Sequence, residues 1–185
     1  MTKAQLTVLA GPTAVGKGTV VAALTKRFPT LNVSISATTR DPRPGELNGV
    51  HYYFVSTQEF DAMIERGDML EWALVHGKNK YGTPRGPVDD ALAAGKPVLL
   101  EIDLAGARQV RTTRPDAQFI FLAPPSWEEL ERRLIGRGTE SPEEQARRLA
   151  TARVELEAAS EFDHVVINDD VERAVDELAR LIGLE

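Results

Sequence analysis

The 185-residue chain contains no cysteine and no long apolar run. Without cysteine it forms no disulfide and no catalytic thiolate, which suits a reducing cytoplasm, the compartment we expect. The apolar stretch "LTVLA" is followed directly by glycine and proline, and it is too short for a signal sequence or a membrane span. Basic residues are also the minority, since 22 lysines and arginines against 28 acidic residues give a net charge of -6. We therefore expect no membrane or nucleic-acid partner, and any anion site must be local.

Apolar runs rich in strand-forming residues alternate with amphipathic helical patterns along the chain. This alternation predicts an α/β fold with a parallel core sheet. The predicted core strands are residues 6–10, 32–36, 98–102, 118–122 and 164–167. The predicted helices are residues 17–28, 57–66, 87–94, 104–113, 127–135, 143–159 and 171–182, with Thr57 as the N-cap of the second.

Two segments interrupt the alternation. Residues 37–83 contain the turn-rich "DPRPGELNG" and the aromatic "HYYF", which predict a small subdomain inserted in the sheet. Residues 126–160 contain two helices around "GRGTESPEE", a Gly-flanked, Arg-bearing hinge that is typical of a lid. The expected organisation is one domain over residues 1–185, with a core formed by residues 1–36, 84–125 and 161–185.

The stretch "GPTAVGKGT", residues 11–19, follows a predicted buried strand and opens a predicted helix. In that context glycines let backbone N–H groups approach a phosphate, and Lys17 adds a positive charge. The alternative is an ordinary glycine-rich turn, which the full spacing and context disfavour. The hydroxyl that usually follows the lysine and contacts Mg²⁺ is missing, because Gly18 stands there and Thr19 comes one place later. The "GKGT" spelling resembles the loop of adenylate kinases, which implies that Thr19 binds a phosphate oxygen and that phosphates and water hold Mg²⁺.

A second group of residues fits a phosphorylated acceptor. Arg40 and Arg43 lie three apart in a Pro-rich loop, with Tyr52 close by, and two guanidinium groups and a phenol suit a monophosphate dianion. Solvated arginines are the alternative. Glu71 stands in the apolar run "MLEWALV", where a carboxylate is costly without a purpose. It could accept from the adjacent N–H donors of guanine, whereas adenine presents an acceptor; the alternative is a structural ion pair, for example with Arg43 or Arg85.

The chain as a whole resembles the guanylate kinase family. After the phosphate loop the similarity continues through S-x-T-T-R-x-P-R-x-G-E, N-G-x-x-Y-x-F, E-W-A, Y-G-T, I-D-x-x-G, R-L-x-x-R-G-T-E and I-N-D-D, in order and with spacing similar to the family's. The departures are Gly18 in place of a common Ser or Thr, Glu101 where Asp is frequent, and a longer turn at "HGKNKYGT". The resemblance implies a P-loop NTPase-type three-layer sandwich with a parallel core sheet, an inserted GMP-binding subdomain and a helical lid. It also implies transfer of the γ-phosphoryl group of MgATP to GMP, and to dGMP, in purine nucleotide metabolism.

The same resemblance assigns residues to roles. For catalysis it implies Lys17, Arg133, Arg137 and Arg148. For ATP it implies Gly11, Pro12, Thr13, Ala14, Val15, Gly16, Lys17, Gly18, Thr19 and Asn168. For GMP it implies Ser36, Arg40, Arg43, Glu46, Tyr52, Glu71, Tyr81, Thr83, Glu101 and Asp103. For Mg²⁺ it implies Thr19 and Asp103, through water.

Several interpretations stay open at this stage. A related P-loop kinase acting on another nucleoside monophosphate or a ribose bisphosphate is the enzyme alternative, and a non-catalytic guanylate kinase-like binding module is the other. Arg133 and Arg137 are spaced one helical turn apart and favour a lid that closes on phosphates, whereas Arg132 and Arg147 are expected to be solvated. Asp103 also suits the N-cap of the following helix. ATP and GMP are the expected partners, and both a monomer and a dimer are compatible with the sequence.

Overall fold

The computed structural model describes residues 3–136 and 138–185, and its core is a parallel sheet of five strands. The strands are β1 (Leu6–Ala10), β2 (Asn32–Val33), β7 (Val98–Glu101), β8 (Gln118–Ala123) and β9 (His164–Ile167). Their order in the sheet is β2-β7-β1-β8-β9. In the centre, Val8 pairs with Leu100 on one side and with Phe119 on the other. All five residues of β1 are buried, as expected for a central strand covered on both faces.

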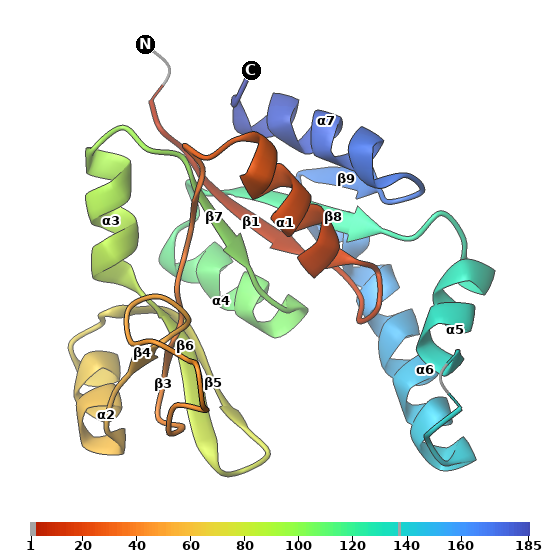
Figure 1. The fold of residues 1–185 in the computed structure, drawn as a ribbon, viewed down its shortest axis with the longest axis horizontal. Helices are drawn as coiled ribbons and strands as arrows, with labels where there is room; N and C mark the ends of the chain where they lie inside the picture. The colour runs from red at the N-terminus through yellow and green to blue at the C-terminus, as the bar shows by residue number, and fades with distance from the viewer. Residues whose placement is uncertain (1–2, 137) are drawn as a thin grey trace.

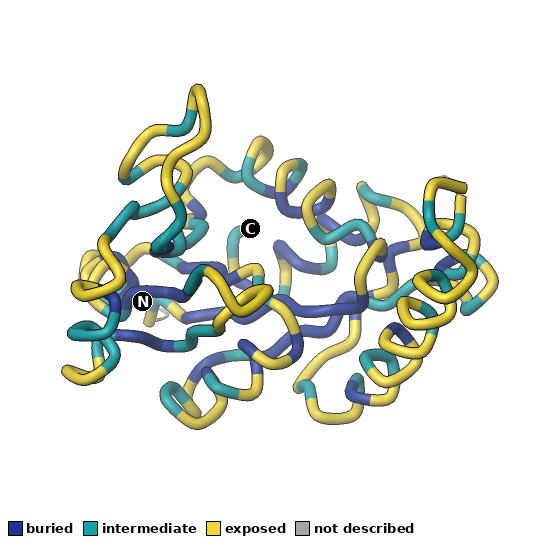
Figure 2. The backbone as a smooth tube through the Cα atoms, turned by 90° about the horizontal axis from the view of Figure 1, so that it is seen from below, coloured by how far each residue is buried: buried dark blue, intermediate teal, exposed yellow. Residues whose placement is uncertain are grey.

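Two layers of helices cover the sheet (Figure 1). On one face lie α1 (Lys17–Arg27) and α7 (Val171–Ile182), and on the other lie α3 (Arg85–Ala93) and α4 (Leu104–Thr113). Alternate strand residues supply the two cores: Leu9 packs with α1 and α7, and Val8 with α3 and α4. Figure 2 shows buried strands in the centre of the molecule and helices with exposed outer surfaces around them. The predicted three-layer α/β sandwich is confirmed.

A small α/β unit lies beside the core. Its sheet has the order β4-β3-β6-β5 and contains β3 (Ala37–Thr38), β4 (Tyr53–Phe54), β5 (Met69–Val75) and β6 (Asn79–Pro84). The helix α2 (Thr57–Glu65) packs its buried Phe60 against this sheet. The turn between β5 and β6 holds His76 and Gly77 at positive φ, 53° and 63°, which reverses the chain tightly.

The predicted lid is a pair of helices, α5 (Trp127–Ile135) and α6 (Pro142–Glu157), and a short 3₁₀ helix, Ala158–Glu161, follows. Ser126 and Ser141 cap the two helix starts, and Glu144 completes a capping box with Ser141. A separate apolar cluster around Leu130, Leu134 and Ala152 joins the helices. In Figure 1 this pair lies on the opposite side of the molecule from the subdomain.

The predicted elements are present, and most differences lie at their ends. The strand predicted over residues 32–36 is shortened to two residues, and the helix predicted over 87–94 begins two residues earlier, at Arg85. The prediction that Thr57 is an N-cap is wrong: Ser56 caps α2 by accepting a hydrogen bond from the Glu59 backbone, and Thr57 is the first helical residue. Among the described residues, no helix is both long and apolar enough to cross a membrane.

Candidate active site

The phosphate loop joins β1 to α1 at the carboxyl end of the core strands. Ala14 and Gly16 adopt positive φ, 68° and 96°, and the Val15 side chain between them is fully buried in the core. A Cβ on Gly16 would lie 2.8 Å from Nδ2 of Asn168, so this position has no room for a side chain. The loop thus holds Ala14 in the left-handed region, which is strained for a residue other than glycine, and it needs glycine at position 16.

The carbonyl of Val15 is the point where three parts of the chain meet. It accepts hydrogen bonds from Nδ2 of Asn168 at 2.8 Å and from Nη1 of Arg133 at 3.2 Å. Asn168, which follows β9, is 4% exposed. Two residues predicted to bind ATP or its phosphates thus contact the phosphate loop itself.

Lys17 begins α1 and is surrounded by polar groups of the core. Its Nζ donates to the carbonyls of Gly11 and Ile102, both at 3.3 Å. Burial lowers the pKa of Lys17 from its usual range, while the nearby carboxylates Glu101, Glu155 and Asp103 act in the opposite direction. Three carboxylates thus act on Lys17. They would repel a phosphate bound at the loop, so such a ligand would need a cation beside it.

The environment of Gly18 bears on how a metal would be held. A Cβ at Gly18 would have only Oε1 of Glu101 within 4 Å, at 3.9 Å, and Thr19 is exposed on the first turn of α1. In the described part of the chain no three acidic or histidine side chains are grouped closely enough to hold a metal ion directly. Carboxylates near a phosphate loop fit Mg²⁺ that keeps its water and binds substrate phosphates.

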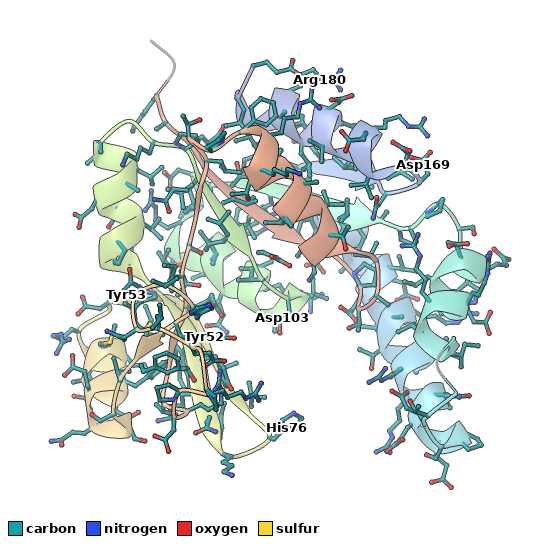
Figure 3. All side chains as sticks on the ribbon, in the orientation of Figure 1. Tyr52, Tyr53, His76, Asp103, Asp169 and Arg180 are labelled. Carbon is teal, nitrogen blue, oxygen red and sulfur yellow. The ribbon has the colours of Figure 1, made fainter. Side chains whose placement is uncertain are left out.

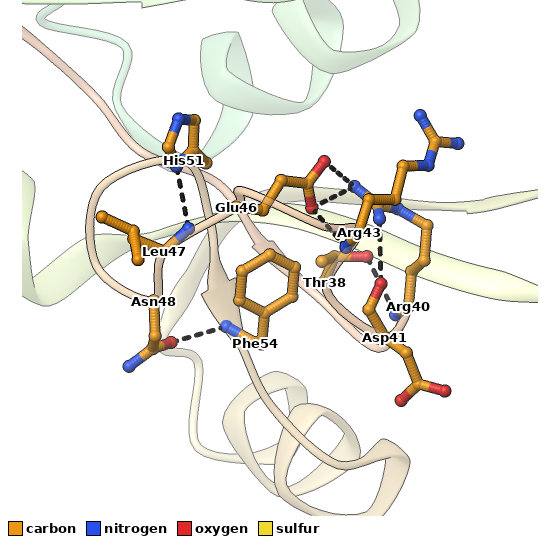
Figure 4. Close-up of polar contacts among 9 residues, drawn as sticks. All are labelled: Thr38, Arg40, Asp41, Arg43, Glu46, Leu47, Asn48, His51 and Phe54. Atoms are coloured by element: carbon orange, nitrogen blue, oxygen red, sulfur yellow. Dashed lines mark hydrogen bonds and ion pairs between the residues drawn. The ribbon is translucent and has the colours of Figure 1, made fainter.

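The predicted acceptor-phosphate residues gather on the inserted subdomain (Figure 4). Nη2 of Arg40 donates to both oxygens of Glu46, at 3.1 and 3.0 Å, and the Arg43 backbone N–H donates to the same carboxylate. The hydrogen bond to Glu46 raises the pKa of Arg40 further above its usual value and lowers the pKa of Glu46. The Arg40 guanidinium also lies 5.3 Å from the Tyr52 ring centroid. Glu46, predicted to contact GMP, is placed here as the partner that orients Arg40.

Tyr81 completes this cluster from β6. Its ring centroid is 6.0 Å from that of Tyr52, and its phenol contributes to the raised pKa of Arg40. Arg43 is exposed at the surface of the loop. Ser36 lies immediately before β3, where its carbonyl accepts from the Tyr53 backbone. Figure 3 shows Tyr52 on the subdomain and Asp103 at the end of the core sheet.

The predicted base-recognition residues are brought together where the subdomain meets the core. Thr83 of β6 is opposite Glu71 of β5, and its hydroxyl donates to Oε1 of Glu71 at 2.7 Å. Burial raises the pKa of Glu71, the nearby Asp103 raises it further, and the hydrogen bonds with Thr83 lower it. The alternative for Glu71 was an ion pair with Arg43 or Arg85. Within the described part of the chain Glu71 forms an ion pair with neither, and Nε of Arg85 donates instead to the Gly67 carbonyl.

Asp103 links this carboxylate to the core. It caps α4 by accepting a 2.7 Å hydrogen bond from the Gly106 backbone. A Cβ on Gly106 would be 3.1 Å from both Oδ1 of Asp103 and Oε2 of Glu71, so the small residue lets the two carboxylates approach the helix N-terminus. Glu101, two residues earlier at the end of β7, lies beside the phosphate loop, since its Oε1 would be 3.9 Å from a Cβ on Gly18.

Gln109 was missed by sequence analysis. From α4 its side-chain amide accepts from the Trp72 backbone N–H at 3.0 Å and donates to the Trp72 carbonyl at 2.9 Å. The amide thus pairs with the free edge of β5 as another strand would. The sequence shows only that Gln109 lies on the partly buried face of a helix. It does not indicate that the amide binds the backbone of Trp72.

The lid residues divide into three groups. Arg133 and Arg148 both line a cavity of about 340 Å³ that reaches Ala14 of the phosphate loop. Arg148 is held by Glu140 at 2.7 Å. The predicted catalytic Arg137 lies outside the described residues. As expected, Arg132 and Arg147 are exposed, and Arg132 pairs with Glu129 of its own helix.

Comparisons with known proteins agree with this arrangement. The guanylate kinase family model matches residues 3–185. The guanylate kinase of Thermobifida fusca (strain YX) is 61% identical over 179 residues, which are 97% of this chain and 91% of that protein. The guanylate kinase of Cutibacterium acnes (strain DSM 16379 / KPA171202) is 59% identical, over 96% of this chain and 89% of that protein. The crystal structure of guanylate kinase from Anaplasma phagocytophilum superposes with a TM-score of 0.74 at 32% identity, over 99% of this chain and 86% of that one. A shikimate kinase from Bacteroides thetaiotaomicron, at 15% identity and a TM-score of 0.50, shares the fold alone. The chain belongs to the guanylate kinase family.

Proposed function

We propose that this protein transfers the γ-phosphoryl group of ATP to GMP, giving ADP and GDP, and that dGMP also serves as acceptor. The observation that carries the choice of guanine is the half-buried Glu71, which the Thr83 hydroxyl orients at the boundary between subdomain and core. An ionised carboxylate can accept from the N1–H and N2–H₂ groups of guanine together, whereas the N1 acceptor of adenine would be repelled.

The Arg40 cluster supports the proposed acceptor phosphate. Arg40, Tyr52 and Tyr81 meet on one side of the subdomain, and Glu46 holds the guanidinium in place. A guanidinium fork beside a phenol binds a dianionic phosphate well because each N–H···O bond is assisted by charge. Arg43 is the second proposed phosphate ligand, and Ser36 the further contact to guanine.

In the proposed reaction an ionised oxygen of the GMP phosphate attacks the γ-phosphorus of ATP. A new P–O bond forms there, the bond from the γ-phosphorus to the β–γ bridging oxygen breaks, and that oxygen leaves with ADP. The attacking oxygen is already ionised at pH 7, so no general base is needed. Catalysis then consists of alignment and neutralisation of charge by Lys17, Arg133, Arg148 and Arg137.

Mg²⁺ is the proposed cofactor, bound with ATP. When present it supplies positive charge that screens the β- and γ-phosphate oxygens. Asp103 and Thr19 would contact it through water, since Gly18 has no hydroxyl to offer. The carboxylates of Glu101 and Asp103 beside Lys17 favour such an arrangement, because they would otherwise oppose a polyphosphate. The proposed compartment is the cytoplasm, which the lack of cysteine supports.

A coupled assay of ADP release tests the proposal. GMP, dGMP, AMP, CMP, UMP and a ribose bisphosphate are each offered with MgATP, and turnover is expected with GMP and dGMP well above the others. Preferred use of another acceptor would assign the chain to a related kinase reaction. No turnover with any acceptor would leave a binding module, and the phosphotransferase proposal would fail.

A further inference from the structure

The two lid helices begin with the same sequence pattern, but they use its glutamate differently. At the start of α6, the Glu144 carboxylate accepts from the Ser141 backbone N–H at 3.2 Å and completes a capping box. The corresponding residue of α5 is Glu129, whose backbone N–H donates to the Ser126 hydroxyl at 3.1 Å. The Glu129 carboxylate is directed along the helix instead, toward two arginines. The position that closes a capping box in one lid helix thus serves the arginines of the other.

Both oxygens of Glu129 contact an arginine. Oε2 is 2.6 Å from Nη2 of Arg132, whose side chain is 74% exposed, and such a solvated pair contributes little to stability. Oε1 accepts from Nε of Arg133 at 3.2 Å. The Arg133 side chain is 36% exposed, and its Nη1 also donates to the Val15 carbonyl of the phosphate loop at 3.2 Å. Because a guanidinium is planar, bonds at Nε and Nη1 together fix the direction of the whole group.

Arg133 lies where the lid meets the proposed donor site. It lines the cavity of about 340 Å³ that Arg148 and Ala14 also line. Its Nη1 would be 3.9 Å from a Cβ on Gly16, so the guanidinium is next to the glycine that the phosphate loop requires. An ordinary ion pair on a helix face has no such third partner. The contacts that run from Glu129 through Arg133 to the loop therefore reach the place where donor phosphates are proposed to bind.

We propose that Glu129 is a positioning residue for Arg133: it holds the guanidinium in the orientation from which Arg133 neutralises charge on the transferring phosphoryl group. Glu129 touches no nucleotide in this arrangement and acts only through Arg133. The inference rests on the proposed function, because it needs Arg133 to act on a phosphoryl group. A guanidinium that is held in advance does not have to be oriented at the moment of transfer.

The charge of Glu129 alone predicts the opposite effect. A carboxylate near bound phosphates repels them, so its removal should favour donor binding and help to neutralise the transition state. Loss of orientation should instead slow the reaction, since a misplaced charge acts less strongly on the transferring group. The direction of the change in kcat therefore separates a positioning role from simple electrostatics.

The kinetic experiment compares Glu129→Ala with the matched control Glu128→Ala. Both residues are acidic and lie in the first turn of α5, and Glu128 is exposed, so both variants remove the same charge from the helix start. We expect kcat to fall about tenfold in Glu129→Ala, with KM for GMP within about twofold of the parent. The control should behave like the parent. An unchanged or raised kcat in folded Glu129→Ala, or an equal fall in Glu128→Ala, overturns the proposal.

Glu129→Gln provides a graded second variant. Its side-chain oxygen keeps an acceptor for Nε of Arg133 but loses the charge, so kcat should fall between the values of the parent and of Glu129→Ala. It also tests the same expected direction should Glu129→Ala fail to fold. A kcat at or above that of the parent in Glu129→Gln, when Glu129→Ala does not fold, overturns the proposal.

A double-mutant cycle tests whether Glu129 acts through Arg133. We expect Arg133→Ala to lower kcat about 100-fold, as for the loss of a group that stabilises the transition state. Adding Glu129→Ala to Arg133→Ala should change kcat by less than about twofold, because the residue to be positioned is already gone. Multiplication of the two single effects would show that Glu129 acts independently of Arg133, and the proposal would fail.

The Nε–H proton of Arg133 gives a readout that does not depend on activity. NMR of nucleotide-free protein with isotope-labelled arginine would follow this proton, whose signal is assigned by its absence from Arg133→Lys. In Glu129→Ala it should exchange with water faster and change its shift, because its acceptor is lost, whereas Glu128→Ala should match the parent. Parent-like exchange and shift in Glu129→Ala would contradict the contact. With these NMR results intact, failure to phosphorylate any acceptor would count against the proposed function alone.

Discussion

The hydroxyl of Thr83 donates a 2.7 Å hydrogen bond to Oε1 of Glu71, across the pairing of β5 with β6. The bond fixes the direction of a half-buried carboxylate. We expect Glu71→Gln to weaken GMP binding about 100-fold, because the amide offers one acceptor where guanine needs two and turns an N–H₂ group toward its donors. ATP affinity should change little. Calorimetry with each nucleotide separately checks this, and parent-like GMP binding would remove Glu71 from guanine recognition.

The raised pKa of Glu71 predicts a pH dependence of GMP affinity. Burial, with Asp103 nearby, raises this pKa above the usual 4.5, and guanine donors bind the ionised form. GMP affinity should therefore fall as the pH is lowered through the raised value. The free energy of unfolding should change with pH in the opposite direction. The contribution of Glu71 to it is fully present below the pKa that Glu71 has in the unfolded chain, and it is lost as the pH rises through the higher pKa of the folded protein.

Glu71→Gln is the control for this pH effect. The GMP phosphate also titrates near pH 6, but it does so equally in both proteins, so the difference between their pH profiles belongs to residue 71. Profiles of the same shape in parent and variant would contradict the assignment.

Glu71 and Thr83, the proposed base-recognition pair, could be chosen from the sequence and its resemblance, whereas the hairpin that aligns them could not. Glu71 in an apolar run signals a functional carboxylate on local grounds alone. No strand was predicted where β5 and β6 lie, because pairing in a hairpin depends on a partner strand and on the two positive φ angles at His76 and Gly77. The N-cap of α2 was misplaced by one residue because Ser56 and Thr57 are both good caps and only the backbone geometry distinguishes them.

Gly18 tolerates a side chain by geometry. A Cβ there would meet only Oε1 of Glu101, at 3.9 Å, and the residue is not held at positive φ. We expect Gly18→Ser to fold and to retain turnover within about threefold, since the added hydroxyl costs no close contact. It should also shift the Mg²⁺ concentration needed for half-maximal rate downwards, because a hydroxyl at this position is the usual metal contact of such loops.

Lys17→Ala is the contrasting variant for the same loop. It should lower kcat by about 10³-fold or more, as expected for losing a charge that acts on the transferring phosphoryl group. Loss of ATP binding by Gly18→Ser would show that the loop requires glycine there for close backbone approach.

Glu46 is expected to act on GMP through Arg40. Both oxygens of Glu46 accept from Nη2 of Arg40, and the two side chains are only 14% and 18% exposed. Glu46→Gln should raise KM for GMP about tenfold with a smaller change in kcat, because Arg40 loses its orientation while its charge remains. The matched control is Glu59→Gln, which removes a pair with Arg66 in which both side chains are 53% exposed, and should leave both constants unchanged. An effect on kcat alone would place Glu46 in the chemical step.

Gln109 supports the strand that carries Glu71, and only the folded structure shows this role. It lies 37 residues from Trp72, and no periodicity in the sequence connects a helix amide to the backbone of a distant edge strand. Gln109→Leu keeps the size but removes both hydrogen bonds, which should cost about 1–2 kcal/mol of unfolding free energy. The expected fall in Tm is about 2–4 °C for each kcal/mol lost.

Because β5 carries Glu71, KM for GMP should rise in Gln109→Leu while ATP binding is kept. Gln109→Glu, which retains the acceptor for the Trp72 N–H but not the donor, should fall between the parent and Gln109→Leu in both measurements. A variant that loses stability without any change in KM for GMP would limit Gln109 to holding the fold.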